Sequence, residues 1–228
     1  MWGRADLVYS LGFIPWLMWH CIHGLVWTEG EYRWTSLPPQ SERWSRTSDS
    51  SVAFLRVYLV STFLHVGVVF LKDVKPKMRV QLLLHHAVSL TGYAMALSSG
   101  TMHWFGMAAG ICEINAFFLT IVMLLKDLRQ DSNLLFLASG TLLFVTQFLL
   151  RLALFSWILY TFLSDLWFAP SPVDLHALGV PRVQVWFGFI TMSLLLVLST
   201  LWTIPITQGF AKSIGLTSTI VKETKKDQ

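Results

Sequence analysis

Long apolar runs alternate with short polar connections along the whole chain. A membrane-spanning helix needs roughly 20 apolar residues, and six runs meet or approach that length: Leu7–Trp27, Val52–Leu71, Val80–Ser98, Met102–Leu125, Leu134–Phe168 and Val183–Ile206. The fifth run is too long for one untilted span, so we expect it to be tilted or to end in an interfacial turn. Dividing the last two runs differently gives seven segments. The pattern predicts an all-α, multi-pass transmembrane bundle of about six helices.

Polar segments separate these runs and indicate how the chain is organised. Residues 28–51 are rich in Ser, Pro, Glu and Arg, which is typical of a solvated loop. A basic loop containing Pro76 follows the second run, and Gly100 lies in a tight turn after the third. We therefore expect a first helix with its polar loop over residues 1–51, a membrane domain over 52–210, and a basic tail over 211–228.

The composition excludes several classes of protein. Of the 228 residues, 54% are hydrophobic and 13% are charged, whereas a soluble domain carries about 25% charged residues. The net charge of +4 comes from Lys and Arg in short loops rather than from one basic face, so we expect no nucleic-acid partner. Both cysteines, Cys21 and Cys112, lie in apolar runs. Their placement predicts neither a disulfide framework nor a cysteine metal site.

The basic residues also predict the orientation of the chain in the membrane. With the N-terminus in the cytosol, 11 of the 17 Lys and Arg residues lie on the cytosolic side and 4 on the opposite side. This bias favours a cytosolic location for both termini. The last four residues include Lys225 and Lys226, and they resemble the dilysine retrieval signal that coat proteins read in membrane proteins of the endoplasmic reticulum. The alternative is a basic tail that attracts anionic lipid headgroups.

Ionisable side chains inside apolar runs are costly and mark candidate functional sites. The rise of about 1.5 Å per helical residue predicts that His65, His86 and Glu113 share one layer of the membrane if their helices are neighbours. Arg151 lies at a depth from which it can reach Glu113. The same runs carry further polar residues, namely Arg56, His85, Asn115 and Gln147. Such residues either serve chemistry or join helices through hydrogen bonds, and the sequence leaves both roles open.

The adjacent histidines His85 and His86 suggest specific chemistry. They point about 100° apart on a helix, so only one can face a site squarely, and the spacing does not choose between them. A nearby carboxylate can hold an imidazole charged or select its tautomer. Such a histidine can take a proton from an amine or hydroxyl, or attack an activated acyl group. The chain has no HxxxH or HExxH spacing, so we expect no metal site.

Several of these residues lie in a pattern that resembles the TLC-domain family. The pattern consists of His85 and His86 within Leu82–Leu90, then Gly92 and Gly100, then Glu113 within Gly110–Phe117, and later Arg151, Trp202 and Pro205. The resemblance extends from about residue 50 to residue 210. It implies a bundle of six or more helices around a chamber for a lipid chain.

The family joins the translocating-chain-associating membrane proteins, the ceramide synthases and the ceroid-lipofuscinosis neuronal protein of the endoplasmic reticulum. In ceramide synthases the histidine pair is catalytic, together with two Asp residues that follow it. Residues 89–125 of this chain contain no Asp. The resemblance therefore favours the branches concerned with lipid composition, lipid sensing or trafficking over ceramide synthase activity.

Three hypotheses follow for the function. The first is a protein of the endoplasmic reticulum that binds membrane lipid, such as an acyl chain or sphingoid base, in the homeostasis of sphingolipids or phospholipids. In that case His86 or His85, together with Glu113, holds a polar headgroup or acyl carbonyl, and the further lipid contacts are His65, Asn115 and Arg151. The second is a ceramide-synthase-like N-acyltransferase that uses His85 and His86, with acyl-CoA as co-substrate and no other cofactor. The third is a cargo receptor in transport from the endoplasmic reticulum to the Golgi. The sequence leaves enzymatic activity and oligomeric state open.

Overall fold

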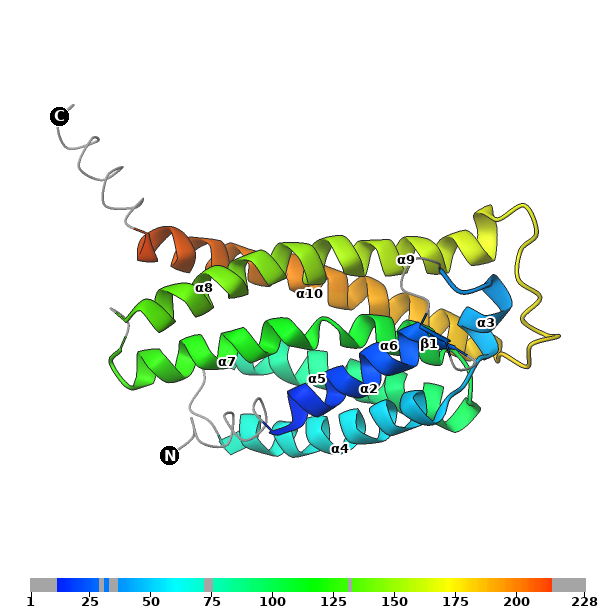
Figure 1. The fold of residues 1–228 in the computed structure, drawn as a ribbon, viewed down its shortest axis with the longest axis horizontal. Helices are drawn as coiled ribbons and strands as arrows, with labels where there is room; N and C mark the ends of the chain where they lie inside the picture. The colour runs from blue at the N-terminus through cyan, green and yellow to red at the C-terminus, as the bar shows by residue number, and fades with distance from the viewer. Residues whose placement is uncertain (1–11, 29–30, 33–36, 72–75, 131–132, 215–228) are drawn as a thin grey trace, which may run out of the picture.

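The computed structural model describes residues 12–28, 31–32, 37–71, 76–130 and 133–214. Most of these residues are helical, and the long helices lie side by side along one axis (Figure 1). In chain order the helices are α2 (Ile14–Val26), α3 (Gln40–Ser45), α4 (Asp49–Leu71), α5 (Pro76–Ser99), α6 (His103–Gly110), α7 (Glu113–Asp127), α8 (Leu134–Thr146), η2 (Gln147–Leu154), α9 (Phe155–Leu163), η3 (Ser164–Phe168) and α10 (Arg182–Ser213). The two-residue strands β1 (Trp27–Thr28) and β2 (Glu31–Tyr32) form one antiparallel pair.

Five helical stretches in the described part of the chain are long and apolar enough to cross a membrane. They are Asp49–Gly67, Met78–Ser99, His103–Asp127, Leu134–Phe168 and Arg182–Ser213, and they match the second to sixth predicted runs. The first predicted run is represented by α2, which buries Leu17 and Cys21 in the bundle; the start of that run lies outside the described residues. The structure confirms an all-α, multi-pass helical bundle.

Two predicted spans have internal features that hydropathy does not reveal. The fourth divides into α6 and α7 at Ile111 and Cys112. Just before this break, Gly110 meets the ring of Phe54 on α4, and a Cβ added at Gly110 would lie 2.3 Å from Phe54 Cζ. The fifth is one continuous helical stretch that contains the π-helical segments η2 and η3. The last helix continues through Pro205 and ends at Ser213, beyond its predicted end.

The prediction that residues 28–51 form a solvated loop is wrong for α3. This helix lies at one end of the bundle (Figure 1) and buries Arg43 and Trp44. Arg43 forms an ion pair with Asp165 of η3, and Trp44 Nε1 donates to the same carboxylate at 2.9 Å. A charged group can be buried when it is paired and hydrogen-bonded. The partner comes from a distant part of the chain, so local polarity does not reveal it.

Candidate functional site

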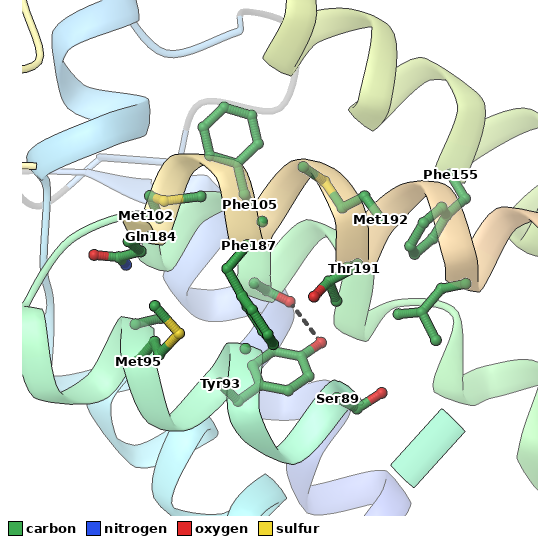
Figure 2. A pocket seen from close by; sticks show the side chains of 16 residues that line it. Ser89, Tyr93, Met95, Met102, Phe105, Phe155, Gln184, Phe187, Thr191 and Met192 are labelled. Carbon is green, nitrogen blue, oxygen red and sulfur yellow. Dashed lines mark hydrogen bonds between the residues drawn. The ribbon is translucent and has the colours of Figure 1, made fainter. Parts of the chain in front are cut away.

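An apolar pocket lies between α5, α6, α9 and α10 (Figure 2). Its cavity volume is about 80 Å³. Met102 and Gln184 line one end, near the turn at Gly100, and Ser89 lines the other, one helical turn after His85 on α5. The pocket therefore begins one helical turn beyond His85 and extends along α5 towards the end of the bundle that carries α3.

Two glycines give the pocket its space. A Cβ added at Gly92 on α5 would lie 3.7 Å from Thr191 Cγ2 on α10, and one at Gly188 would lie 2.9 Å from Met102 Cε. The hydroxyl of Tyr93, on the wall, donates to the Gly106 carbonyl at 3.0 Å. The remaining wall is mainly apolar, with Phe, Met, Leu and Ala side chains. Such a lining suits a hydrocarbon chain.

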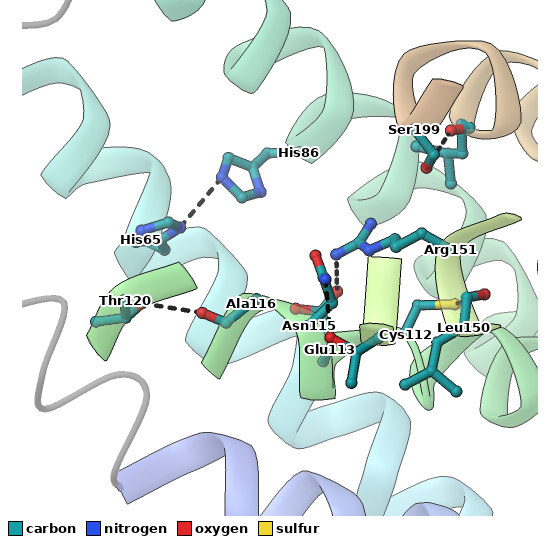
Figure 3. A network of polar contacts seen from close by, with 12 residues as sticks. His65, His86, Cys112, Glu113, Asn115, Ala116, Thr120, Leu150, Arg151 and Ser199 are labelled. Carbon is teal, nitrogen blue, oxygen red and sulfur yellow. Dashed lines mark hydrogen bonds and ion pairs between the residues drawn. The ribbon is translucent and has the colours of Figure 1, made fainter. Parts of the chain in front are cut away.

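The two histidines on α5 face different neighbours. His86 Nε2 lies 3.1 Å from His65 Nδ1 on α4, which is a hydrogen bond whose donor depends on the tautomers (Figure 3). The ring of His85 packs against Trp202 on α10, with the ring centroids 5.4 Å apart. Both α5 histidines are buried. The ring of His86 therefore lies on the side of α5 that faces α4, and the ring of His85 lies on the side that faces α10.

Arg151 and Glu113 form a second pair in this region (Figure 3). Arg151 Nη2 lies 3.7 Å from Glu113 Oε1, and both residues are about nine-tenths buried. Arg151 belongs to η2, which also carries Gln147, and the Gln147 amide donates to the Ser199 carbonyl at 2.9 Å. π-Helical segments are rare and often occur at functional sites. Here the segment turns two polar side chains into the bundle.

Three buried nitrogens of this layer have no hydrogen-bond partner among the described residues: His85 Nδ1, His86 Nδ1 and Arg151 Nε. Buried polar atoms in native proteins are nearly always hydrogen-bonded. We call His85, His86 and Arg151, with their partners His65 and Glu113, the polar layer. It offers hydrogen-bonding capacity to a polar group that is not part of the chain.

Comparison with known proteins identifies the family. A family model described as the TLC domain matches residues 5–208, which is most of the 228 residues. The chain belongs to the TLC-domain family. The match begins before the first predicted helix, so it includes that helix as well as the polar layer. No curated protein and no solved structure matches the chain significantly. With its apolar spans, the TLC-domain chain is a multi-pass membrane protein of a lipid-related family.

The structure brings together some of the predicted site residues of this TLC-domain protein. His65 contacts His86, and Arg151 contacts Glu113, but these are two separate pairs. Neither histidine of α5 forms an ion pair with a carboxylate among the described residues. Asn115 instead joins α7 to α8, because its amide donates to the Leu143 carbonyl and to Thr146 Oγ1, both at 3.1 Å.

Two further features concern possible metal ligands and the C-terminal lysines. Within these residues, no group of three His, Cys, Asp or Glu side chains is arranged to hold a metal ion. Lys225 and Lys226 lie outside the described part of the chain. Sequence reasoning missed Tyr93 and Thr191 in the pocket. Their only signal was a hydroxyl inside an apolar run, and such hydroxyls usually bond their own helix.

Proposed function

We propose that this TLC-domain protein binds a membrane lipid in the endoplasmic reticulum and acts in the homeostasis of sphingolipids or phospholipids. The polar end of the lipid, a headgroup or an acyl carbonyl, lies at His85, His86 and Arg151. The hydrocarbon chain lies in the apolar pocket. The observation that carries this proposal is the group of buried nitrogens without a hydrogen-bond partner among the described residues, which begins one helical turn from the pocket wall at Ser89.

The contacts within the polar layer suit this task. The hydrogen bond to His65 selects the protonation of one His86 nitrogen and leaves the other, Nδ1, for a ligand. Glu113 orients Arg151 by pairing with Nη2, while Nε has no partner among the described residues. Hydrogen bonds from a guanidinium to phosphate or carboxylate oxygens are about twice as strong as neutral ones. A phosphate or carbonyl oxygen is therefore a suitable ligand for this layer.

The location in the endoplasmic reticulum rests on the sequence. The dilysine-like tail and the excess of basic residues on one side support an endoplasmic reticulum protein with both termini in the cytosol. Both features agree, because a retrieval signal must face the cytosolic coat proteins that read it.

Native mass spectrometry of the purified full-length protein tests the lipid site. We expect wild type to carry lipid, and His85→Ala/His86→Ala to carry about tenfold less, because two hydrogen bonds to the polar end are lost. His176→Ala is the matched control, because His176 is exposed on a loop outside the membrane spans. Unchanged occupancy in the double variant would remove the histidines from the site, and a wild-type protein without lipid would refute lipid binding.

An N-acyltransferase is the second candidate, and the His65–His86 hydrogen bond favours it. In this reaction the nitrogen of a long-chain amine attacks the acyl-CoA thioester carbon while His86 takes the amine proton. The carbon–sulfur bond then breaks, an amide forms, and the thiolate leaves and takes up the proton. Glu113 pairs with Arg151 rather than with an imidazole, so no carboxylate in the described part of the chain pairs with a charged His86. Amide formation that disappears in His86→Ala would establish the enzyme, whereas no product from several acyl donors and acceptors would exclude it.

A further inference from the structure

The hydroxyl of Thr191, on α10, is unusual within the apolar pocket. Thr191 is 8% exposed, and its Oγ1 has no hydrogen-bond partner among the described residues. Ser and Thr inside helices commonly bond the carbonyl three or four residues earlier. On the same helix Ser199, Thr200 and Thr203 all do so, at 2.8–2.9 Å. Thr191 does not form this bond, although residues about two to three turns further along the same helix do.

The orientation of Thr191 explains the difference. Its methyl group faces α5, where the absent side chain of Gly92 leaves room for it. Figure 2 shows the hydroxyl directed into the pocket, on the wall that α10 contributes. The neighbouring hydroxyl of Tyr93 is already engaged with the Gly106 carbonyl. Thr191 therefore presents to the pocket a hydroxyl that no described residue engages.

The position of Thr191 relates this hydroxyl to the polar layer. Gly92, opposite Thr191, follows His85 by seven residues on α5, so Thr191 lies about 10 Å along the helix from the histidines. A lipid chain that starts at the polar layer and enters the pocket passes Thr191 well before its end. A saturated segment at this point leaves the hydroxyl of Thr191 without a partner, whereas a chain with its own hydroxyl there satisfies both groups.

We propose that the pocket selects a lipid chain that carries a hydroxyl group near its middle, and that Thr191 recognises this hydroxyl by a hydrogen bond. This inference rests on the proposed function, because the polar layer holds the head of the lipid. Gly92 and Thr191 are then specificity-determining residues, and the shared chemistry of the ligand is a mid-chain hydroxylated hydrocarbon, either as a free acid or within a larger lipid.

A competition between ricinoleic acid and oleic acid tests the selection. The two acids have the same length and one double bond each, but only ricinoleic acid has the mid-chain hydroxyl. Native mass spectrometry of the full-length protein distinguishes them by one oxygen atom. We expect wild type to retain ricinoleic acid about three- to tenfold in excess, the ratio that one hydrogen bond supports. Thr191→Val, which keeps the shape, should bring the ratio close to one, and Thr191→Ser should retain the preference.

Two further variants separate this inference from the proposed function. Thr200→Val removes an exposed, back-bonded hydroxyl on the same helix and should leave the preference unchanged. Gly92→Leu fills the pocket and should lower the binding of both acids. If wild type binds both acids equally and Gly92→Leu binds neither, the proposed selection for a hydroxyl is wrong, but the proposed lipid site is supported. If neither acid binds, or Gly92→Leu has no effect, both proposals fail.

The source of the hydroxylated chain is distinguished by repeating the competition with ricinoleoyl and oleoyl lysophosphatidylcholine. A preference with the free acids alone assigns a fatty acid as the ligand, and a preference with the lysophospholipids alone assigns a complex lipid. A preference that persists in Thr191→Val in either series overturns the role of Thr191.

Discussion

Two buried arginines show how individual contacts separate a structural residue from a candidate site residue. Arg43 is fully engaged: Nε and Nη2 bond the Asp165 carboxylate, and Nη1 donates to the Pro38 carbonyl. Arg151 is equally buried, but only Nη2 pairs with Glu113, and Nε has no partner among the described residues. The Arg43 pair holds α3 against η3, whereas Arg151 retains capacity for a ligand.

At this scale we predict that Asp165→Asn destabilises the protein by roughly 3–5 kcal/mol, because it leaves the buried charge of Arg43 without its counter-ion. Thermal unfolding of the detergent-solubilised protein, followed by tryptophan fluorescence, measures the change. Asp127→Asn is the control, because Asp127 is exposed, and exposed substitutions usually change stability by about 0.5 kcal/mol or less. Equal melting temperatures for the two variants would contradict a structural role for the ion pair.

At the scale of the helix, close approach and local irregularity decide the packing. The Gly110 position brings α6 against α4, because the ring of the fully buried Phe54 occupies the space where a side chain would lie. The π-helical η2 turns Gln147 and Arg151 into the bundle, and Gln147 bonds Ser199 and Thr203 of α10. These features place the polar layer beside the pocket.

We predict that Gly110→Ala lowers stability by about 1–3 kcal/mol, the usual cost of overpacking. Gly140→Ala is a matched control on α8, because the added Cβ meets no atom within 4 Å outside its own stretch of helix, and alanine is favoured over glycine in a helix by about 1 kcal/mol. Thermal unfolding compares the two. The double variant Gly110→Ala/Phe54→Leu should cost less than the sum of its single changes, because the two side chains compete for one space. Strict additivity would show that the contact is absent.

At the scale of the whole molecule, the spans alternate in direction and gather the connections at two ends of the bundle. The turn at Gly100, α3 and residues 169–181 lie at one end, and the connection between α7 and α8 lies at the other (Figure 1). The connections before and after the span Leu134–Phe168 therefore face opposite sides of the membrane. From the charge bias we predict that the α7–α8 connection lies in the cytosol.

Cysteine labelling of sealed endoplasmic reticulum vesicles checks this arrangement. Gln130→Cys and Ser171→Cys place thiols at exposed positions on the two ends. We expect an impermeant maleimide to label Gln130→Cys from outside, and Ser171→Cys only after detergent opens the vesicles. The native Cys21 and Cys112 are buried, so the unsubstituted chain is the background control. The reverse pattern would invert the orientation, and labelling of both from outside would refute a single span between them.

Prediction from sequence succeeded for the spans and for the depth of polar residues, and it failed where contacts cross the bundle. Counting residues from the turns correctly brought His65 to the level of His86 and Arg151 to Glu113. Counting did not show that His86 and Glu113 have different partners, that Asn115 bonds α8, or that Trp44 is buried. The direction in which a side chain points depends on how its helix is rotated about its own axis. The sequence pattern of apolar and polar residues gives little information on that rotation when the helix is apolar on all sides.

The sequence by itself determined that this is a multi-pass helical membrane protein of the TLC-domain family. The reason is that lipid admits only segments with internally bonded backbones, and long apolar runs satisfy that requirement residue by residue. Only the tertiary structure decided which nitrogens of the polar layer have no partner among the described residues, where the pocket lies, and which way Thr191 points. These properties arise between helices, because the partner of a buried polar group, or its lack of one, is set by what another part of the chain places beside it.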